Sequence, residues 1–442
     1  MKRYGNLYSQ IYDMDNLKLA HKNAQKGKSW YKEVKMINKN PEPYLKMLQD
    51  MLINKTYKTS EYQTFMKKDS GKERKIYKLP YFPDRICQWA ILQVIEPMLL
   101  KNFIADTYSA IPGRGIHTAL YRMQKAIQTD VVNTQYCLKL DAKKYYPSIN
   151  HDILKMKYRR LFKDKDLLWL LDEIIDSTEG DTGIPIGNYL SQYSGNFYFS
   201  EFDHWIKEEK HIKYYYRYMD DIVIFGKSKE ELHKLRKEID LYFKTKLKLK
   251  IKENWQVFPT FVRGVDFVGY RTFLNYKLLR KSTCKSFKRK MNKIKKKLKQ
   301  GHQINYSEWC SINSYNGWLI HCDSYRLHEK YIKPLEFHAN QYYLQNIKKK
   351  GWSEMVDHGK VRSTIRPERM VIDEYSVWIC ENITEVEVED IQTGSEETEV
   401  ERHIEYEYDM VQYEKNEFIK AQSEQITDTE LALCEIYESL GV

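Results

Sequence analysis

The sequence predicts an α+β fold in which short strands that carry acidic residues are combined with amphipathic helices. Apolar residues alternate over residues 136–140 and end at Asp141, as they do in a half-buried strand. Apolar and aromatic runs flank Asp220-Asp221, a pair suited to a tight turn between two strands. Between these features, a stretch that begins at Gly183 has bulky residues at helical spacing: Tyr193, Phe197 and Trp205.

The first part of the chain is rich in Lys and Tyr. Residues 1–60 are predicted to form an N-terminal helical extension, and residues 61–130 a basic hairpin, a helix and a cationic loop flanked by glycines. Lys67 and Arg74 lie in the hairpin, and Arg114 lies in the loop. Because a guanidinium fork matches phosphate oxygens, we expect these cations near a nucleotide or a template. A solvated charged hairpin would have the same composition.

Three carboxylates of the sequence could act together. Asp141, Asp220 and Asp221 are each predicted at the end of a strand or in a turn, where they could hold two divalent cations about 3.5–4 Å apart. One cation would activate an attacking hydroxyl and the other would steady a leaving pyrophosphate. Mg²⁺, or Mn²⁺ in its place, is the expected ion because hard cations prefer oxygen ligands. Alone, an Asp-Asp pair is more often a solvated turn, so the interpretation depends on the neighbouring blocks.

In their order, these blocks resemble the reverse transcriptase family over residues 50–335. LDAKKYYPSI resembles motif A of that family, GIPIGNYLSQ motif B, RYMDD motif C, and RGVDFVGY the primer grip. The resemblance implies a right-hand polymerase with fingers, a palm built on a split βαβ antiparallel sheet, and a helical thumb. It also implies that Asp141, Asp220 and Asp221 are the catalytic and metal-binding residues. The primer grip implied in the same way comprises Gly264, Phe267, Gly269 and Tyr270.

The nucleotide site implied by the resemblance includes an aromatic residue and four residues of the second block. Tyr146 would be the steric gate, because a ring under the sugar collides with a 2′-hydroxyl. Most relatives have Gln-Gly in motif B, whereas this chain begins the block with Ile-Gly and ends it with Ser-Gln. That departure resembles reverse transcriptases of diversity-generating retroelements, and lineages used in anti-phage defence are similar. The four residues are Ile186, Gly187, Ser191 and Gln192.

The resemblance names the expected partners. They are an RNA template, such as a dedicated non-coding RNA, a DNA primer or product, and deoxynucleoside triphosphates. A defence enzyme that makes repetitive or untemplated DNA is one alternative, and a non-catalytic RNA-binding scaffold is another. The intact carboxylates Asp141, Asp220 and Asp221 argue against the scaffold.

Charge is distributed unevenly along the chain. The net charge is +12, but residues 368–442 contain only 4 of the 73 basic residues and 22 of the 61 acidic ones. Residues 1–367 therefore carry a net charge of +30, which indicates a polyanionic partner such as nucleic acid. The acidic tail would repel nucleic acid, so a protein partner is expected for it, unless it only solubilises a basic enzyme. The tail also resembles, weakly, short proteins of prophage tail-assembly regions.

Domain boundaries follow from these patterns. Residues 131–275 are expected to form the palm, 276–345 the thumb, 346–367 a basic linker, and 368–442 a small acidic α+β domain. In the thumb, apolar residues at helical spacing predict one helix over 282–300, and the family resemblance suggests a second over 313–332. The acidic domain alternates as strands do and closes with a helix that begins at Thr427.

Two further observations exclude other classes of protein. The seven cysteines are scattered, odd in number and without CxxC spacing, so neither a disulfide framework nor a zinc site is expected. No apolar run approaches the length that spans a bilayer, so no membrane association is expected. The expected location is the cytoplasm of a bacterial cell, with a prophage as one source of the gene.

Overall fold

The computed structural model describes residues 3–69, 72–346, 355–363, 367, 370–372, 376–394 and 397–414. The chain divides into two compact units, each with its own internal packing. The first contains Met1–Lys293 and Tyr315–Ile332, and the second contains Ile294–Ser314 and the described residues of 333–414. Two helices, Lys281–Lys299 and Tyr306–Leu319, contribute residues to both units.

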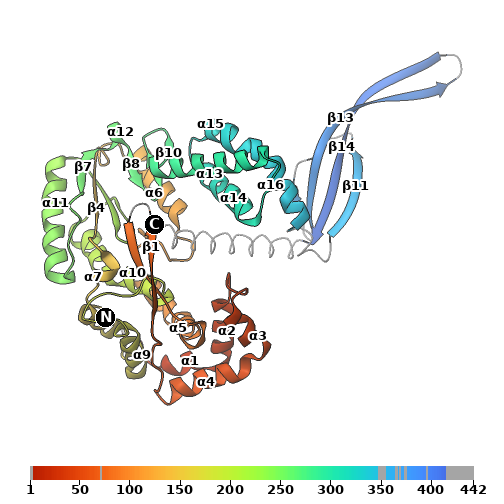
Figure 1. Cartoon of the computed structure of the whole chain (residues 1–442). Coiled ribbons are helices and arrows are strands. Elements are labelled where there is room, and N and C mark those ends of the chain that lie inside the picture. Colours follow the sequence, from red (N-terminus) through yellow and green to blue (C-terminus); the bar gives the residue numbers. More distant parts are fainter. Residues whose placement is uncertain are drawn as a thin grey trace. The chain divides into compact units, whose positions relative to one another are not determined.

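The first unit contains a five-stranded mixed sheet, of which β4 and β7 are labelled beside helix α11 in Figure 1. Its strand order is β3-β5-β6-β4-β7; only β3 and β5 pair in parallel. The alternation over residues 136–140 is confirmed as strand β4, and the runs beside Asp220-Asp221 are confirmed as β5 and β6. The strands are β3 (Thr107–Tyr108), β4 (Tyr136–Asp141), β5 (Tyr215–Tyr218), β6 (Asp221–Gly226) and β7 (Gln256–Pro259).

The two faces of this sheet differ, because successive residues of a strand point to opposite sides. Leu138 and Leu140 of β4, with Ile222 and Ile224 of β6, are buried in the main hydrophobic core. Helix α11 (Lys229–Tyr242) lies against β4, β6 and β7 and adds Leu232, Leu235 and Ile239 to that core. The opposite face carries Lys139, Asp141 and Asp221, so burial of one face sets the orientation of the acidic residues on the other.

Helices form most of the remainder of the first unit. The predicted N-terminal helices are present as α1 to α4, and helix α5 follows the β1–β2 hairpin. Helices α8 and α9 lie between motif A and motif B, where no helix was predicted. The elements are α1 (Tyr8–Ile11), α2 (Met14–Ala24), α3 (Lys32–Lys39), α4 (Pro41–Ile53), β1 (Gln63–Asp69), β2 (Lys72–Lys78), α5 (Ile86–Asn102), α6 (Ile116–Thr129), α7 (Tyr145–Ser148), α8 (His151–Leu161), α9 (Lys165–Ile175) and α10 (Tyr189–His204).

A three-stranded antiparallel sheet and several helices follow. The sheet has the order β10-β9-β8, with β8 Val265–Phe267, β9 Tyr270–Thr272 and β10 Lys277–Leu279. The helix predicted over 282–300 is α13 (Lys281–Lys299). The single helix suggested over 313–332 is wrong, because α14 ends at Leu319 and a turn precedes the next helical residues. The remaining helices are α12 (Thr260–Arg263), α14 (Tyr306–Leu319), α15 (Tyr325–Leu327) and α16 (Lys333–Asn346).

The second unit contains a four-stranded antiparallel sheet of order β11-β14-β13-β12. Its strands are β11 (Met355–Ser363), β12 (Met370–Ile372), β13 (Ser376–Gly394) and β14 (Glu397–Glu414). Strand β11 lies within residues 346–367, which we expected to be a linker. Its backbone pairs with that of β14 in an antiparallel register. The helix predicted from Thr427 lies outside the described residues. No helix in the described part of the chain is long and apolar enough to cross a membrane.

Candidate active site

The three carboxylates meet at one edge of the five-stranded sheet. Asp141 ends β4 and pairs directly with Asp221, the first residue of β6. Asp220 occupies the turn that joins β5 to β6, and the turn is tight enough that Met219 adopts a left-handed φ of +51°. Adjacent strands thus bring together residues that are 80 positions apart in the chain.

The electrostatics of this cluster disfavour negative charge. Burial raises the pKa of Asp220 well above its usual range, and the neighbouring Asp141 raises it further. Burial also raises the pKa of Asp221, although Lys139 acts in the opposite direction. Carboxylates placed in this way need nearby cations to remain ionised at neutral pH.

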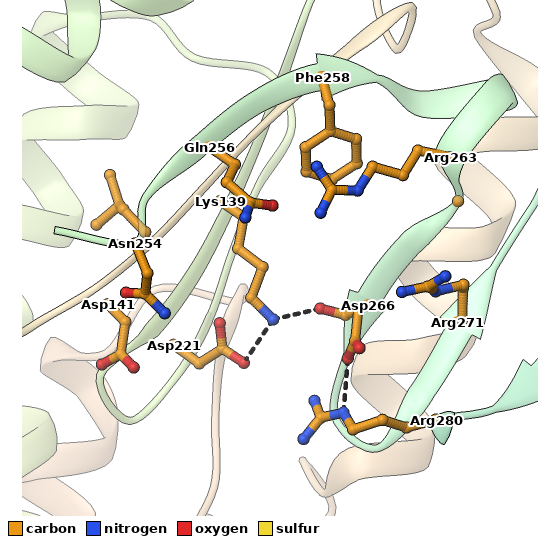
Figure 2. A pocket seen from close by; sticks show the side chains of 12 residues that line it. Lys139, Asp141, Asp221, Asn254, Gln256, Phe258, Arg263, Asp266, Arg271 and Arg280 are labelled. Carbon is orange, nitrogen blue, oxygen red and sulfur yellow. Dashed lines mark hydrogen bonds and ion pairs between the residues drawn. The ribbon is translucent and has the colours of Figure 1, made fainter. Parts of the chain in front are cut away.

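Two lysines supply positive charge to the cluster. Lys252 forms an ion pair with Asp141, and its Nζ lies 4.0 Å from Oδ2 of Asp220. Lys139 lies 3.4 Å from Oδ2 of Asp221 and also donates to the backbone carbonyl of Asp266, as Figure 2 shows. Neither lysine was singled out from the sequence, because one lies inside a strand and the other in a lysine-rich segment.

The carboxylates fit a pair of hard cations by their donor set. Oδ1 of Asp141 and Oδ1 of Asp221 are both buried and have no hydrogen-bond partner among the described residues. Such oxygens are costly to leave unsatisfied, and a cation would satisfy them. As they stand, no group of three or more His, Cys, Asp or Glu side chains in the described structure is arranged to hold a metal ion. Lys252 contacts Asp141 and lies near Asp220, on the carboxylates that a cation would use.

Tyr146 lies close to the acidic turn. It belongs to the short helix α7, and its hydroxyl lies 3.5 Å from the sulfur of Met219. On its other side, the ring faces Gly195 of α10, where an added Cβ would lie 3.5 Å from the ring. Tyr145, which precedes it, is buried and stacks on Phe199 of α10. The ring of Tyr146 is therefore held between the turn and helix α10.

The second predicted block forms a loop that is hydrogen-bonded to the basic hairpin. The backbone N–H of Tyr77 in β2 donates to the carbonyl of Ile186 at 3.1 Å. Gly187 has a φ of +120°, and a Cβ added to it would lie 2.3 Å from the carbonyl oxygen of Tyr77. Asn188 extends the contact by donating to the hydroxyl of Tyr62 at 2.9 Å. Only glycine fits at position 187 while the hairpin is docked.

The other predicted nucleotide-site residues have different positions. Lys67 and Arg74 face one another in the hairpin register, and their side chains lie outside the described part of the structure. Ser191 is buried in the first turn of α10, whereas Gln192 is partly exposed. The guanidinium of Arg114 donates to the carbonyl of Ile104 at 2.9 Å. That contact braces the loop of Arg114, a role that the sequence did not suggest.

The predicted primer-grip residues lie just before β8 and around the turn between β8 and β9. Gly264 and Gly269 have φ values of +70° and +86°, and a Cβ on either would overlap an aromatic ring, that of Phe273 or Trp318. Phe267 and Tyr270 are fully buried, and the Tyr270 hydroxyl donates to the carbonyl of Trp318 at 3.0 Å. Their side chains therefore support the turn from inside, so any contact with a primer must come from the backbone or from neighbouring side chains.

A cavity of about 420 Å³ lies between the carboxylates and this turn. Arg263, Arg271 and Arg280 line it, together with Lys139 (Figure 2). Arg280 is paired with Asp266 at 2.6 Å, but no ion pair of Arg263 or Arg271 with a carboxylate is found within the described residues. The cavity therefore combines the acidic cluster with two arginines that are available to an anion. These arginines escaped the sequence analysis because nothing local distinguishes them from other basic residues.

Comparison with known proteins identifies the part of the chain that carries this cluster. Residues 66–272 match the family model described as reverse transcriptase (RNA-dependent DNA polymerase). The match covers somewhat less than half of the chain, and over these residues the chain is similar to reverse transcriptases. The matched span contains Asp141, Asp220 and Asp221, as well as the hairpin, the Gly187 loop and the β8–β9 turn.

Individual relatives of the chain are distant. Protein YkfC of Escherichia coli (strain K12) is 25% identical over 270 residues, which cover 51% of this chain and 70% of that protein. Among solved structures, apo telomerase from Candida tropicalis is 14% identical with a TM-score of 0.41, over 66% of this chain and 60% of that chain. A telomerase from Candida albicans, in complex with a TWJ fragment of telomeric RNA, is 11% identical with a TM-score of 0.39, over 51% and 46%. The chain thus spans about half to three-fifths of the telomerase chains.

Proposed function

We propose that this chain extends a DNA primer along an RNA template, with Asp141, Asp220 and Asp221 as ligands of two divalent cations. The observation that carries the proposal is the direct pairing of Asp141 with Asp221, next to Asp220, within the residues that are similar to reverse transcriptases. The buried, unsatisfied oxygens of Asp141 and Asp221 support it, because a carboxylate in that state is suited to a cation.

The residues around the carboxylates have distinct roles in this proposal. Mg²⁺ ions, when bound, would activate the primer hydroxyl and stabilise the leaving pyrophosphate. Lys252 and Lys139 neutralise the acidic cluster until the cations replace them. Tyr146 closes the space beneath the sugar and excludes a 2′-hydroxyl, since its ring is held between Met219 and α10.

The nucleic acid is held by charge. Arg263 and Arg271 line the cavity beside Asp141 and Asp221, where they are suited to the phosphates of a primer strand. The β1–β2 hairpin carries Lys67 and Arg74 opposite one another and is docked on the Gly187 loop, which places this basic hairpin next to helix α10. The sequence of the product comes from base pairing with the template, so the protein need contact only backbone and sugars.

A primer-extension assay tests this proposal. The purified chain should extend a DNA primer on an RNA template with deoxynucleotides and Mg²⁺, and should stop when the metal is chelated. A matched reaction with ribonucleotides measures the sugar discrimination. If the folded protein shows no metal-dependent extension on any RNA template, the proposal is wrong.

At a finer level, we propose an error-prone enzyme of a prokaryotic or phage retroelement that copies a dedicated RNA. The proposal rests on Ile186, which offers no side-chain hydrogen bond where most relatives have a glutamine. Replacement Ile186→Gln should lower misincorporation, most visibly opposite template adenine, as measured by deep sequencing of cDNA from a defined RNA. An error spectrum without an excess at adenines, unchanged by Ile186→Gln, would favour a defence enzyme instead.

A further inference from the structure

The strand that leads into the acidic turn contains a buried arginine. Arg217 lies in β5, two residues before Met219, and none of its surface is exposed. Asp203, near the end of α10, is equally buried and forms a two-point ion pair with it: Nε donates to Oδ1 at 2.7 Å and Nη2 to Oδ2 at 2.5 Å. Removal of either partner of a buried ion pair destabilises the fold strongly, because the other charge then remains buried without a counter-charge.

Every N–H of the Arg217 guanidinium has an acceptor. Besides the two bonds to Asp203, Nη1 donates to Oδ1 of Asn196 at 3.1 Å, and Nη2 donates to the backbone carbonyl of Asn196 at 3.4 Å. The fifth bond runs from Nη1 to the carbonyl of Met219 at 3.0 Å. A lysine has three donors on one nitrogen and could not make these five bonds.

The bond to Met219 falls at the most constrained point of the turn. Met219 has a left-handed φ of +51°, a conformation that is unfavourable for a non-glycine residue. Its carbonyl belongs to the peptide group that continues into Asp220, so the orientation of this peptide sets the direction in which the Asp220 carboxylate points. The strained conformation therefore needs a partner that holds the carbonyl in place.

Asp203 is anchored from two other elements. Thr107 of β3 donates to its Oδ2 at 3.0 Å, and Tyr215 of β5 donates to its Oδ1 at 2.5 Å. Asn196, the second acceptor of Arg217, donates in turn to the carbonyl of Ser109 at 2.8 Å. The network thus joins α10, β3 and the β5–β6 turn without contacting the cavity.

We propose that Arg217 is a positioning residue: through the carbonyl of Met219 it fixes the Asp220 carboxylate in the direction needed for cation binding. This inference rests on the proposed function, because it assigns Asp220 to a cation. It goes beyond that function because it makes the orientation of Asp220 depend on Asp203 and Asn196. Both residues belong to α10, the helix that follows the Gly187 loop. Arg217 itself is too deeply buried to reach a substrate.

The test removes the contact while limiting the damage to the fold. The double variant Asp203→Asn/Arg217→Met leaves no unpaired buried charge, and Arg217→Lys keeps the charge but loses the bond to Met219. The control Lys157→Met/Glu201→Gln removes another ion pair of α10, 2.7 Å long, that does not contact the turn. Thermal unfolding checks the fold, Mn²⁺ binding is measured by electron paramagnetic resonance, and primer extension is titrated with Mg²⁺.

We expect Mn²⁺ affinity to fall about tenfold or more in both Arg217 variants, with the half-saturating Mg²⁺ concentration raised by a similar factor. High Mg²⁺ should then restore part of the extension rate, a response that general destabilisation would not produce. The control should bind Mn²⁺ as the wild type does. Wild-type Mn²⁺ affinity in a folded Arg217 variant would overturn the inference, and so would the failure of both variants to fold. Because Mn²⁺ binding is measured without a template, the comparison still holds if wild-type extension on RNA fails.

Discussion

The five-stranded sheet and the four-stranded C-terminal sheet use strands in opposite ways. In the first, short strands bury Leu138, Leu140, Ile222 and Ile224 on one face and leave the other face for charge. In the second, β13 and β14 are 19 and 18 residues long, and only Cys380 and Tyr408 are buried among the side chains described there. A buried face fixes the direction of the residues opposite it, so the first sheet can position chemistry, whereas the second offers an extended surface.

The largest expected effect follows from removing one carboxylate of the five-stranded sheet. Replacement Asp220→Asn should reduce extension about 1,000-fold or more, because a cation that loses a ligand loses several kcal/mol of stabilisation at the reacting phosphate. Quantitative single-turnover extension is the measurement.

The same variant should fold at least as well as the wild type. Burial and Asp141 raise the pKa of Asp220, so its ionised form opposes folding, and that cost grows as the pH rises through the folded pKa. A neutral Asn escapes this cost, and thermal unfolding at neutral pH without metal should show no loss. Near-normal extension by Asp220→Asn would remove Asp220 from the site.

A methyl group at Gly187 should separate the hairpin from the loop it contacts. In Gly187→Ala the added Cβ overlaps the carbonyl of Tyr77, and the positive φ adds strain of about 1–3 kcal/mol. We expect a higher KM for the deoxynucleotide, measured by steady-state incorporation. Gly113→Ala is the matched control, since its φ is +72° but nothing lies within 4 Å of its Cβ position. Equal KM values in the two variants would mean that strain alone, and not the hairpin contact, matters.

Loss of the Tyr146 ring should change sugar selection and little else. Replacement Tyr146→Ala opens the space beside Met219, so ribonucleotides should be incorporated with discrimination reduced on the order of 10–100-fold. The ratio of kcat/KM for a ribonucleotide and its deoxy counterpart is the measurement. An active variant with unchanged discrimination would place the gate elsewhere.

Lowering the pH should weaken the contact that His117 of α6 makes with Tyr270 of β9 in the first unit. His117 stacks on His321 and lies 3.2 Å from the hydroxyl of Tyr270; burial, His321 and Lys277 lower the pKa of His117 to about 4. The unfolded chain takes up this proton at a higher pH, so stability should fall as the pH drops from about 6.5 towards 4. His117→Asn should flatten that part of the stability profile in chemical denaturation, and an unchanged profile would contradict the assignment.

The smallest effect is expected from removing the C-terminal sheet. A chain that ends at Asn346, the last residue of α16, lacks all four strands of that sheet but keeps the acidic cluster and the cavity. Extension on a simple primer-template should stay within about twofold, since like charge keeps the acidic tail from nucleic acid. A folded, truncated chain that has lost catalysis would make the sheet part of the polymerase.

Local patterns were sufficient to predict the strands and the acidic turn. The alternation before Asp141 and the runs around Asp220-Asp221 are patterns within a few residues, and such patterns predict strands with one buried face. The spacing of apolar residues likewise predicted helix α13. These features are set within a few residues, and the structure has them where the pattern placed them.

Contacts between distant segments could not be predicted in this way. Lys252 reaches Asp141 across 111 residues, and Arg217 meets Asp203 inside a core where charge is rare. Phe267 and Tyr270 remain predicted members of the primer grip, but the burial of both side chains was not evident from the sequence. Strand β11 was missed because its pairing partner lies more than 40 residues further along the chain.

The pairing of β11 with β14 determines where the chain can be truncated without exposing an unpaired strand. The first and last strands of the C-terminal sheet are neighbours, so a chain cut between residues 364 and 396 would retain β11 without the strand that satisfies its backbone. Exposed strand edges of that kind recruit other strands and promote aggregation. A fragment that is intended to stay monodisperse should therefore end before Met355, the first residue of β11. A tag or fusion partner that leaves the sheet intact should be attached after Glu414, the last residue of β14.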